Sequence, residues 1–482
     1  DYIGEHLLPG SLGRAATALA FASALLSLYS YYRQTNREPS SLKLVGRWSF
    51  YVHSFSVFTM VGLIFYMLGQ HYFEYDYVWK HSSLDLPVRY IFSSFWEGQE
   101  GSFMLWTFWH AVLGIVISRT AGKWEAPVMA VLASVQLFLV SMVLGIYPFD
   151  IKIGSSPFVL IRELPDNVGL PWTQMEDYLQ RIPAFMDGNG LNPLLQNYWM
   201  TIHPPITFLG FASTVVPFTF AIAGLWTRKY NEWLKPALPW TFFSVMILGT
   251  GILMGGAWAY EALSFGGFWA WDPVENSSLV AWLTVVGAAH LMLIHKNKGG
   301  TLKSSFFLAI ISFLLILYST FLTRSGILGD TSVHAFVDLG LSGQLLIYLF
   351  FFTGLSLGML AWHYRRLPKS IVQDELWSRE FWMFIGALTL LASAFQISMT
   401  TSIPVWNALF GPEGWLSILP EKLAPPLDAI DHYNSFQIPF AIVISLLMAS
   451  GQFLRYKKTE ARRFFRNLRN SIVLTILIGG VL

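Results

Sequence analysis

The sequence contains no cysteine and few charged residues. Among its 482 residues there is no Cys, so the chain can form no internal disulfide bond, no thiolate metal site and no thiol nucleophile. Asp, Glu, Lys and Arg together make up 12% of the residues, whereas soluble domains carry about 25%. The formal net charge of +2 is too small to indicate nucleic acid as a partner. The composition therefore excludes an ordinary soluble domain and favours an integral membrane protein.

Long apolar runs are what the sequence has instead. Hydrophobic residues account for 54% of the chain, and the runs are each long enough to cross a bilayer, which takes roughly 20 residues. They span 11–32, 48–70, 102–120, 126–148, 202–226, 237–257, 276–295, 304–324, 341–364, 380–401 and 434–454, and a further run begins near 471. Because these runs show no strict alternation, they favour helices over barrel strands. The sequence predicts an all-α polytopic membrane protein with about 11–12 transmembrane helices.

Charge alternates between successive connections. Lys and Arg fill the first, third, fifth and later odd-numbered connections, most densely at 455–469. The even-numbered connections carry an acidic excess, as at 150–177. By the positive-inside rule the odd connections are cytoplasmic. The N-terminus would then lie outside, together with short surface loops and helices, of which one is expected over 172–186.

The spans divide the chain into four parts. We expect an N-terminal four-helix transmembrane part over 1–148 and an outer loop over 149–201. A core region with two flanking histidines would occupy 202–340, and further transmembrane helices 341–482. The last apolar run stops at the final residue, which suggests that the sequence is truncated.

One segment between two apolar runs is rich in tryptophan. The Trp-rich loop, residues 264–276, contains Trp269-Ala270-Trp271-Asp272-Pro273. Its proline, glycines and carboxylates are unfavourable in a helix within lipid. An interfacial aromatic belt would explain a single Trp. The block as a whole favours a platform for a flat, amphipathic ligand.

Two histidines are predicted at the same surface as the Trp-rich loop. His203 precedes Pro204-Pro205, which suit the first turn of a helix, and His334 lies in the next outer loop. Two neutral imidazoles facing each other across an aromatic slot would satisfy a haem iron. The alternative is two interfacial histidines bonded to backbone.

A third histidine is predicted inside the membrane. His290 lies within the run 276–295, and an ionisable group at that depth is a candidate functional residue. A second iron ligand would have to come from another helix, and His53, His110 and His363 are candidates. Each of those three could equally bond to a neighbouring helix.

Several short patterns resemble the CcmF-type cytochrome c haem lyases of the haem-handling WWD family. They are Asn192-Pro193-Leu194-Leu195-Gln196, His203-Pro204-Pro205, Trp258-Ala259-Tyr260-Glu261, Trp269-Ala270-Trp271-Asp272-Pro273-Val274-Glu275-Asn276, Thr323-Arg324-Ser325-Gly326 and Ser332-Val333-His334-Ala335-Phe336. Glu100-Gly101-Ser102 and Leu376-Trp377-Ser378-Arg379-Glu380 are also similar to its patterns. Phe265 and Phe268 stand where relatives often have Trp, which keeps the aromatic face but loses the indole N–H.

The resemblance implies roles for individual residues. His203 and His334 would take the axial positions of an incoming haem, and His290 would ligate a resident b-type haem. Phe268 and Trp258 would contact the cofactor. The residues expected at the reaction surface are Trp269, Trp271, Asp272, Glu275, Asn276 and Arg324.

The resemblance also implies a reaction and partners. A lyase of this type would accept haem from a periplasmic haem chaperone of the CcmE type and join its vinyl groups to the cysteines of apocytochrome c. Chaperone subunits of the CcmH/CcmI type would present the apocytochrome, and quinol would supply electrons to the b haem. The protein would lie in the bacterial cytoplasmic (inner) membrane with its WWD loop on the periplasmic side.

Other functions fit part of the pattern. A haem exporter or lyase of the CcsBA type would carry the same Trp-rich loop. A proton-coupled transporter would use His290 and Glu261 as relay groups. A lyase paralogue dedicated to a nitrite reductase would look the same in sequence.

Overall fold

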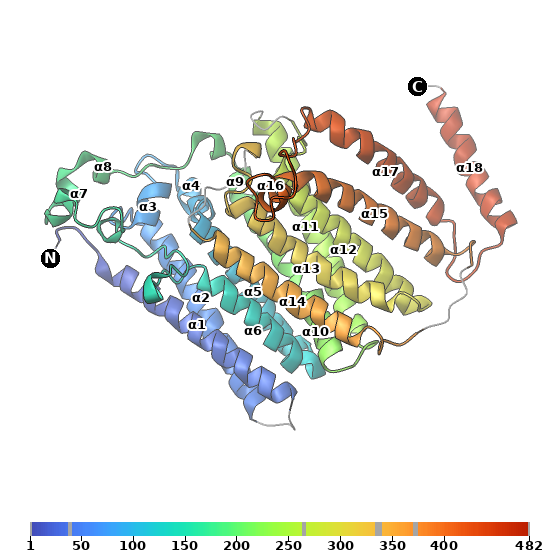
Figure 1. Ribbon diagram of the computed structural model, residues 1–482, viewed down its shortest axis with the longest axis horizontal. Coiled ribbons are helices and arrows are strands. Elements are labelled where there is room, and N and C mark those ends of the chain that lie inside the picture. The colour runs from blue at the N-terminus through green and yellow to red at the C-terminus, as the bar shows by residue number, and fades with distance from the viewer. Residues whose placement is uncertain (1, 37–40, 263–266, 333–339, 370–374, 481–482) are drawn as a thin grey trace.

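The computed structural model describes residues 2–36, 41–262, 267–332, 340–369 and 375–480. Within these ranges the regular elements are helices, and no strand occurs. The long helices pack side by side as one inclined bundle (Figure 1). The all-α prediction is confirmed.

Eleven of the described helical segments are long and apolar enough to cross a membrane. They are α1 (Leu7–Thr35), α2 (Leu42–Gly69), α5 (Gln99–Thr120), α6 (Glu125–Ser141) with the turn before it, α9 (Trp199–Ser213) joined to α10 (Val215–Trp226), α11 (Leu234–Ala262), α12 (Pro273–Asn297), α13 (Leu302–Arg324), α14 (Ser342–His363), α15 (Arg379–Thr401) and α17 (Ala429–Gly451). The polytopic character of the protein is thereby confirmed. A further amphipathic helix, α18 (Ala461–Gly479), begins ten residues before the predicted run near 471.

The prediction for the prolines after His203 was wrong. Pro204 and Pro205 lie inside α9, beyond its first turn, because the helix already begins at Trp199. The amide of Trp199 bonds to Asn197 Oδ1 at 3.1 Å, so the chain upstream of the prolines supplies the start of the helix. His203 therefore stands in the second turn and not at the helix start.

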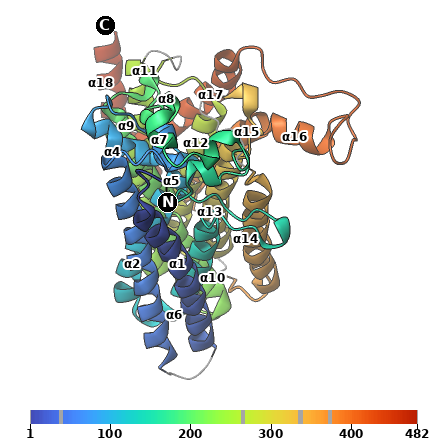
Figure 2. The ribbon, with the colours of Figure 1, turned by 90° about the vertical axis from the view of Figure 1, so that its left-hand side faces the viewer.

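Short helices gather at the end of the bundle that carries residues 267–272, which we call the Trp-rich end. Figure 2 shows α4, α7 and α8 there, near the end of α11, while α16 projects from the bundle on the right. The short elements are α3 (Asp76–His81), α4 (Val88–Ser93), α7 (Tyr178–Arg181), α8 (Pro183–Met186) and α16 (Ile403–Phe410), with 3-10 turns at Ser94–Trp96, Gly122–Trp124, Pro148–Asp150, Ile161–Glu163, Pro171–Gln174, Pro193–Leu195 and Gly329–Thr331.

The single surface helix expected over 172–186 is broken into pieces. A 3-10 turn ends at Gln174, α7 ends at Arg181, and α8 starts at Pro183. Ile182 is extended, with φ −95° and ψ 113°. A residue before proline is driven out of the helical region, which explains the break.

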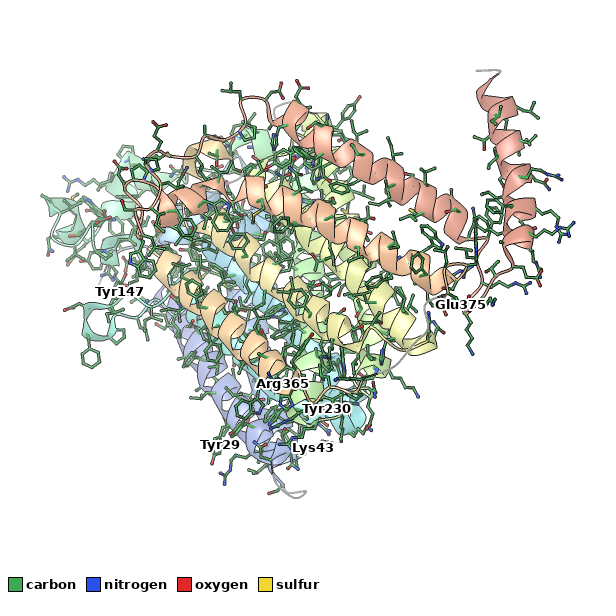
Figure 3. All side chains as sticks on the ribbon, turned by 45° about the vertical axis from the view of Figure 1, so that its right-hand side comes forward. Tyr29, Lys43, Tyr147, Tyr230, Arg365 and Glu375 are labelled. Carbon is green, nitrogen blue, oxygen red and sulfur yellow. The ribbon has the colours of Figure 1, made fainter. Side chains whose placement is uncertain are left out.

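The opposite end of the bundle carries the basic connections, and we call it the basic end. Figure 3 shows Lys43, Tyr230 and Arg365 together at this end, far from Tyr147. The alternation of charge along the sequence thus corresponds to two ends of one bundle. Which end faces the cytoplasm stays a prediction, as do the boundaries of the four parts.

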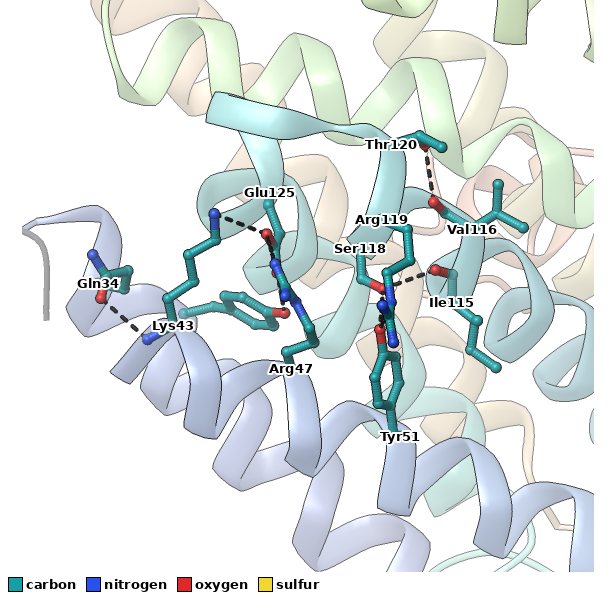
Figure 4. A network of polar contacts seen from close by, with 11 residues as sticks. Gln34, Lys43, Arg47, Tyr51, Ile115, Val116, Ser118, Arg119, Thr120 and Glu125 are labelled. Carbon is teal, nitrogen blue, oxygen red and sulfur yellow. Dashed lines mark hydrogen bonds and ion pairs between the residues drawn. The ribbon is translucent and has the colours of Figure 1, made fainter. Parts of the chain in front are cut away.

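A buried carboxylate joins three helices at the basic end. Glu125, only 2% exposed, accepts hydrogen bonds from Arg47 Nε at 2.8 Å and Nη2 at 2.6 Å (Figure 4). Lys43 Nζ lies 2.9 Å from Glu125 Oε2, and the Tyr31 hydroxyl donates to Oε1 at 3.0 Å. Since a buried charge is tolerated only when paired, this cluster fixes α1 and α2 against α6.

Candidate functional site

A large cavity opens between the helices at the Trp-rich end. Its volume is about 1380 Å³, above the roughly 300–1,000 Å³ of most small-molecule pockets. Its walls come from α5, α9, α11, α12 and α13, and its rim includes α3 and the segment 145–166. The space is enough for a flat ligand together with part of a second molecule.

His203 forms one wall of this cavity. Its ring meets the Trp258 ring edge-on, with centroids 5.7 Å apart and planes at 70°. Thr207 Oγ1, one helical turn along α9, lies 3.2 Å from His203 Nδ1 and orients the ring. A side chain at Gly255 would place its Cβ 2.9 Å from His203 Cε1. Because residue 255 of α11 is a glycine, there is room for the His203 imidazole.

The carboxylates of the Trp-rich loop shape the start of α12. Asp272 Oδ1 accepts the amide of Val274 at 2.9 Å, and the two acids form a capping box. Glu275 Oε2 accepts the amides of Ala270 at 3.0 Å and Asp272 at 3.1 Å. Such bonds satisfy helix-start amides that would otherwise be unpaired. The loop therefore ends at Asp272, and 273–276 belong to α12, contrary to the predicted boundary.

The two tryptophans of the loop face different surroundings. Trp269 and Glu275 line the cavity, and the rings of Trp269 and Trp271 stand perpendicular, 5.9 Å apart. Trp271 has φ +56°, a left-handed conformation that is costly for a bulky residue. That turn directs its ring onto Tyr433 in α17, with centroids 5.1 Å apart and an angle of 18°.

Other predicted residues of this region hold the loop in place. Asn276 Nδ2 donates to the Trp271 carbonyl at 2.9 Å and to Thr401 Oγ1 at 3.1 Å. The Phe268 ring fills the space that a Cβ on Gly256 would need, 2.7 Å away. Asn276 thus acts through the loop backbone and not through the cavity.

A buried guanidinium also lines the cavity. Arg324 is 7% exposed, and its Cζ lies 5.2 Å above the Phe103 ring. Gln99 Nε2 donates to the Arg324 carbonyl at 3.2 Å. Glu100 Oε1 accepts the Ser155 hydroxyl at 2.6 Å. Arg324, Gln99 and Glu100 all line the cavity, which gives this wall both signs of charge.

A tyrosine from α3 completes that wall. Burial, followed by the nearby carboxylates of Glu100 and Glu97, raises the pKa of Tyr77 well above its usual value. The phenol therefore stays protonated and donates to the Phe95 carbonyl at 2.6 Å. Its hydroxyl supports the backbone of the segment from which α5 begins.

His334 lies outside the described residues. The described chain before it ends at Ser332, whose hydroxyl donates to Asp272 Oδ1 at 2.8 Å. The Trp-rich loop is therefore in direct contact with the segment that follows α13.

His290 sits in α12 as predicted, apart from the cavity. Its Nδ1 bonds to the Val286 carbonyl at 2.8 Å. Helix α12 packs against α11, α13 and α15, whereas the other candidate ligands are on α2, α5 and α14. The structure does not bring His290 together with any of them.

Each of those histidines has different surroundings. His53 Nδ1 bonds to the Ala20 carbonyl at 2.9 Å, and Gln136 Nε2 donates to its Nε2 at 2.9 Å. His363 Nδ1 accepts the Tyr230 hydroxyl at 2.8 Å. His110 is fully buried beside Trp106. The contacts of His53 and His363 match the alternative in which polar groups join neighbouring helices, whereas both ring nitrogens of His110 are buried without a hydrogen-bond partner in the described chain.

Glu261, a relay candidate in the transporter alternative, holds the start of α9. Its carboxylate accepts the Tyr198 hydroxyl at 2.9 Å and Trp199 Nε1 at 2.8 Å. These bonds direct it toward the surface at the Trp-rich end and away from His290 in mid-helix.

Several cavity residues were not predicted. Thr207 could have been found, since a hydroxyl four residues after a histidine shares its helix face. Gln99, Tyr77 and Trp106 come from segments more than ninety residues before His203. No local pattern connects such residues, so only the packing of α5 against α9 places them in one wall.

Comparison with known proteins gives the family. A sequence model described as "Cytochrome C assembly protein" matches residues 96–328. The "Cytochrome c-type biogenesis protein CcmF" of Pseudomonas fluorescens is 34% identical over 446 residues, which is 92% of this chain and 60% of that protein. The CcmF of Haemophilus influenzae is 30% identical, over 97% of this chain and 66% of the relative. The chain belongs to the CcmF-type family.

The fold agrees with this assignment. A solved "Cytochrome c Heme Lyase CcmF" superposes with a TM-score of 0.73 at 23% identity, over 98% of this chain and 67% of the other. The chain spans about 60% of the length of the Pseudomonas fluorescens CcmF. His203, Trp258 and Trp269 lie within the family match at 96–328, whereas Tyr77 of the cavity precedes it and Tyr433, which anchors Trp271, lies beyond it.

Proposed function

We propose that this protein is a haem lyase of cytochrome c maturation, and that the cavity at the Trp-rich end receives the haem to be attached. One observation carries the proposal. The Asp272–Ser332 hydrogen bond of 2.8 Å ties the Trp-rich loop to the chain two residues before His334. Trp269 of the same loop lines the cavity together with His203.

The cavity suits a porphyrin in shape and chemistry. Aromatic side chains of its lining, among them Trp258 and Trp269, provide flat apolar surface. His203, oriented by Thr207, provides an imidazole for the iron. Arg324 provides a buried guanidinium, the group that best pairs with carboxylates such as haem propionates.

Thioether formation needs orientation more than it needs a catalytic group. Each apocytochrome thiol adds its sulfur to one vinyl carbon and its hydrogen to the other, so no atom is lost and no net oxidation occurs. Holding the vinyl edge against the thiols lowers such a barrier by several kcal/mol. Since this chain has no cysteine, it cannot exchange disulfides with its substrate. His203 would hold the haem until the substrate's own histidine replaces it.

A resident b haem would be held by His290. The Nδ1 bond to the Val286 carbonyl fits this role, because metal-binding histidines commonly fix the ring through their second nitrogen. Such a haem would supply an electron, taken from quinol, that keeps the transferred iron ferrous. The other ligand is not assigned to this chain.

The partners follow from the chemistry. Haem would come from a periplasmic chaperone of the CcmE type, and apocytochrome c would come with chaperone subunits of the CcmH/CcmI type. The protein would lie in the cytoplasmic membrane with its Trp-rich end on the periplasmic side, as the basic connections at the other end favour.

Complementation tests the proposal. The full-length protein is expressed in a bacterium lacking its own lyase, and covalent haem on a reporter cytochrome c is measured. Wild type should restore attachment, and His203→Ala should reduce it to near background. His6→Ala is the control, since His6 is at the same end but bonds to Glu74 outside the cavity. Normal attachment by the His203 variant would overturn the proposed site.

A further inference from the structure

A second, smaller pocket lies at the basic end, where α15 starts and α17 ends. Its volume is about 360 Å³. Arginines dominate its wall, and we call it the basic pocket. It is formed by Arg379, Arg455, Arg463, Tyr456, Thr459 and Asn467, with the backbone of 452–454.

The segment between α17 and α18 is held rigidly around this pocket. Arg379 donates from Nε to the Leu454 carbonyl at 2.9 Å and from Nη2 to the Gln452 carbonyl at 3.2 Å. The amide of Lys457 donates to both oxygens of Glu380, each at 2.9 Å. Glu380 is only 1% exposed. These bonds give a connecting segment fixed geometry, which exposed loops usually lack.

The residues just before α15 also fix the start of α18. The Thr459 amide donates to the Trp377 carbonyl at 2.7 Å, and the Trp377 ring contacts the Phe464 ring at 5.5 Å. Arg455 N donates to Thr459 Oγ1 at 2.8 Å. The sequence Leu376-Trp377-Ser378-Arg379-Glu380, which the haem site does not use, therefore serves as the scaffold of the basic pocket.

The arginines of the pocket have no carboxylate at ion-pair distance within the described residues. The ion pair formed nearby joins Lys458 to Glu375 at 3.5 Å, and none of the pocket arginines forms one with an Asp or Glu in the described chain. Arg455 and Arg463 are exposed. Two planar guanidinium groups around a small concavity match the oxygens of a phosphate group.

The surroundings indicate which phosphate compound fits. Apolar side chains of α17, such as Ile442 and Leu446, are 55% and 64% exposed. On α18, Ile472 and Ile476 are 48% and 67% exposed, and this helix stands apart from the bundle at the right of Figure 1. Acyl chains could lie along these surfaces while a headgroup occupies the pocket at the helix ends.

We propose that the basic pocket binds the phosphate of an anionic phospholipid headgroup. Pockets of basic residues between membrane helices have the charge and position for such headgroups. The phosphate would lie between the start of α15, the end of α17 and the first turns of α18. This role is independent of the haem site at the opposite end.

Lipid retention tests the proposal. The full-length protein is placed in nanodiscs of phosphatidylcholine with a small share of phosphatidylglycerol, and lipids kept after detergent extraction are counted by native mass spectrometry. Wild type should keep phosphatidylglycerol in preference to phosphatidylcholine. The R455Q/R463Q double variant should lose that preference by roughly five-fold for each arginine removed.

Two controls separate the outcomes. The double variant R462Q/R466Q removes equal charge from exposed positions of α18 outside the pocket wall and should keep the preference. Inorganic phosphate at millimolar concentration should not displace the lipid. Displacement by phosphate would show a site for a soluble anion, and equal losses in both double variants would show a diffuse charge effect; either result overturns the proposal.

Discussion

Trp271 stacks on Tyr433, although most of the C-terminal half of the sequence separates the two residues. Their ring centroids are 5.1 Å apart at an angle of 18°, and Trp271 Nε1 donates to Asn434, 163 residues away, at 2.9 Å. The Trp-rich loop is thus attached to α17, while its other tryptophan, Trp269, lines the cavity. One tryptophan positions the loop, and the other is available to a ligand.

Replacing Trp271 should therefore lower the stability of the protein. Trp271→Phe keeps a ring for the stack but loses the bond to Asn434, which should lower stability by about 1 kcal/mol. Trp271→Ala also loses the aromatic pair, worth about 0.5–1.5 kcal/mol more. Thermal unfolding in detergent checks the order. Trp415→Phe, at a residue 84% exposed, is the control and should change nothing; an equal effect there would contradict the anchoring role.

The cluster around Glu125 should be a main source of stability at the basic end. Glu125→Gln leaves Arg47 and Lys43 without their carboxylate. Because their side chains are 28% and 42% exposed, the cost should lie below the about 3–5 kcal/mol of a fully buried pair. The melting temperature should fall clearly. Glu232→Gln breaks the exposed pair with Lys123 and should have little effect, as surface pairs contribute little. Similar melting temperatures for both variants would show that the Glu125 cluster is not structural.

The sequence predicted the helices better than it predicted the site. Runs such as 304–324 became α13 (Leu302–Arg324) with small shifts, because some 20 apolar residues in lipid have few alternatives to a helix. His203 and Trp269 line the same cavity, and their roles toward a ligand stay a prediction. The separation of Trp269 from Trp271 was not predictable, since it depends on the positive φ of Trp271 and on Tyr433.

Long-range packing explains the other residues that were missed. Gln99 reaches the cavity because Trp96 Nε1 donates to the Met200 carbonyl at 2.8 Å, which joins the start of α5 to α9. The break between α7 and α8 depends on Pro183, which the surface-helix prediction did not take into account.

The tight start of α5 should not tolerate a side chain at Gly101. An added Cβ would lie 1.6 Å from the Phe95 carbonyl oxygen and 2.2 Å from the Tyr77 hydroxyl. Gly101→Ala should therefore destabilise the protein by at least the roughly 1–3 kcal/mol of overpacking and reduce haem attachment. Gly62→Ala meets nothing within 4 Å and is the matched control. Normal yield and activity for Gly101→Ala would mean that this wall is not rigid.

His290→Ala should remove the b-type absorption of the purified full-length protein while leaving its folding intact. The reason is that an iron held by two residues in the membrane loses one ligand. Dithionite-reduced spectra check this. His363→Ala, which breaks only a bond to Tyr230, should keep the b-type band. A band that survives in His290→Ala would contradict the assignment of the resident haem.

Electron paramagnetic resonance of haem added to the purified full-length protein tests the central claim most directly, with the His290→Ala background used to remove the resident signal. We expect the haem iron to give a low-spin signal typical of two imidazole ligands when His203 is present. Changing His203 to Ala should convert it to a high-spin signal with weaker haem binding, and added imidazole should restore the low-spin form. An unchanged low-spin signal in the His203 variant would contradict haem binding in the cavity beside Trp258 and Trp269.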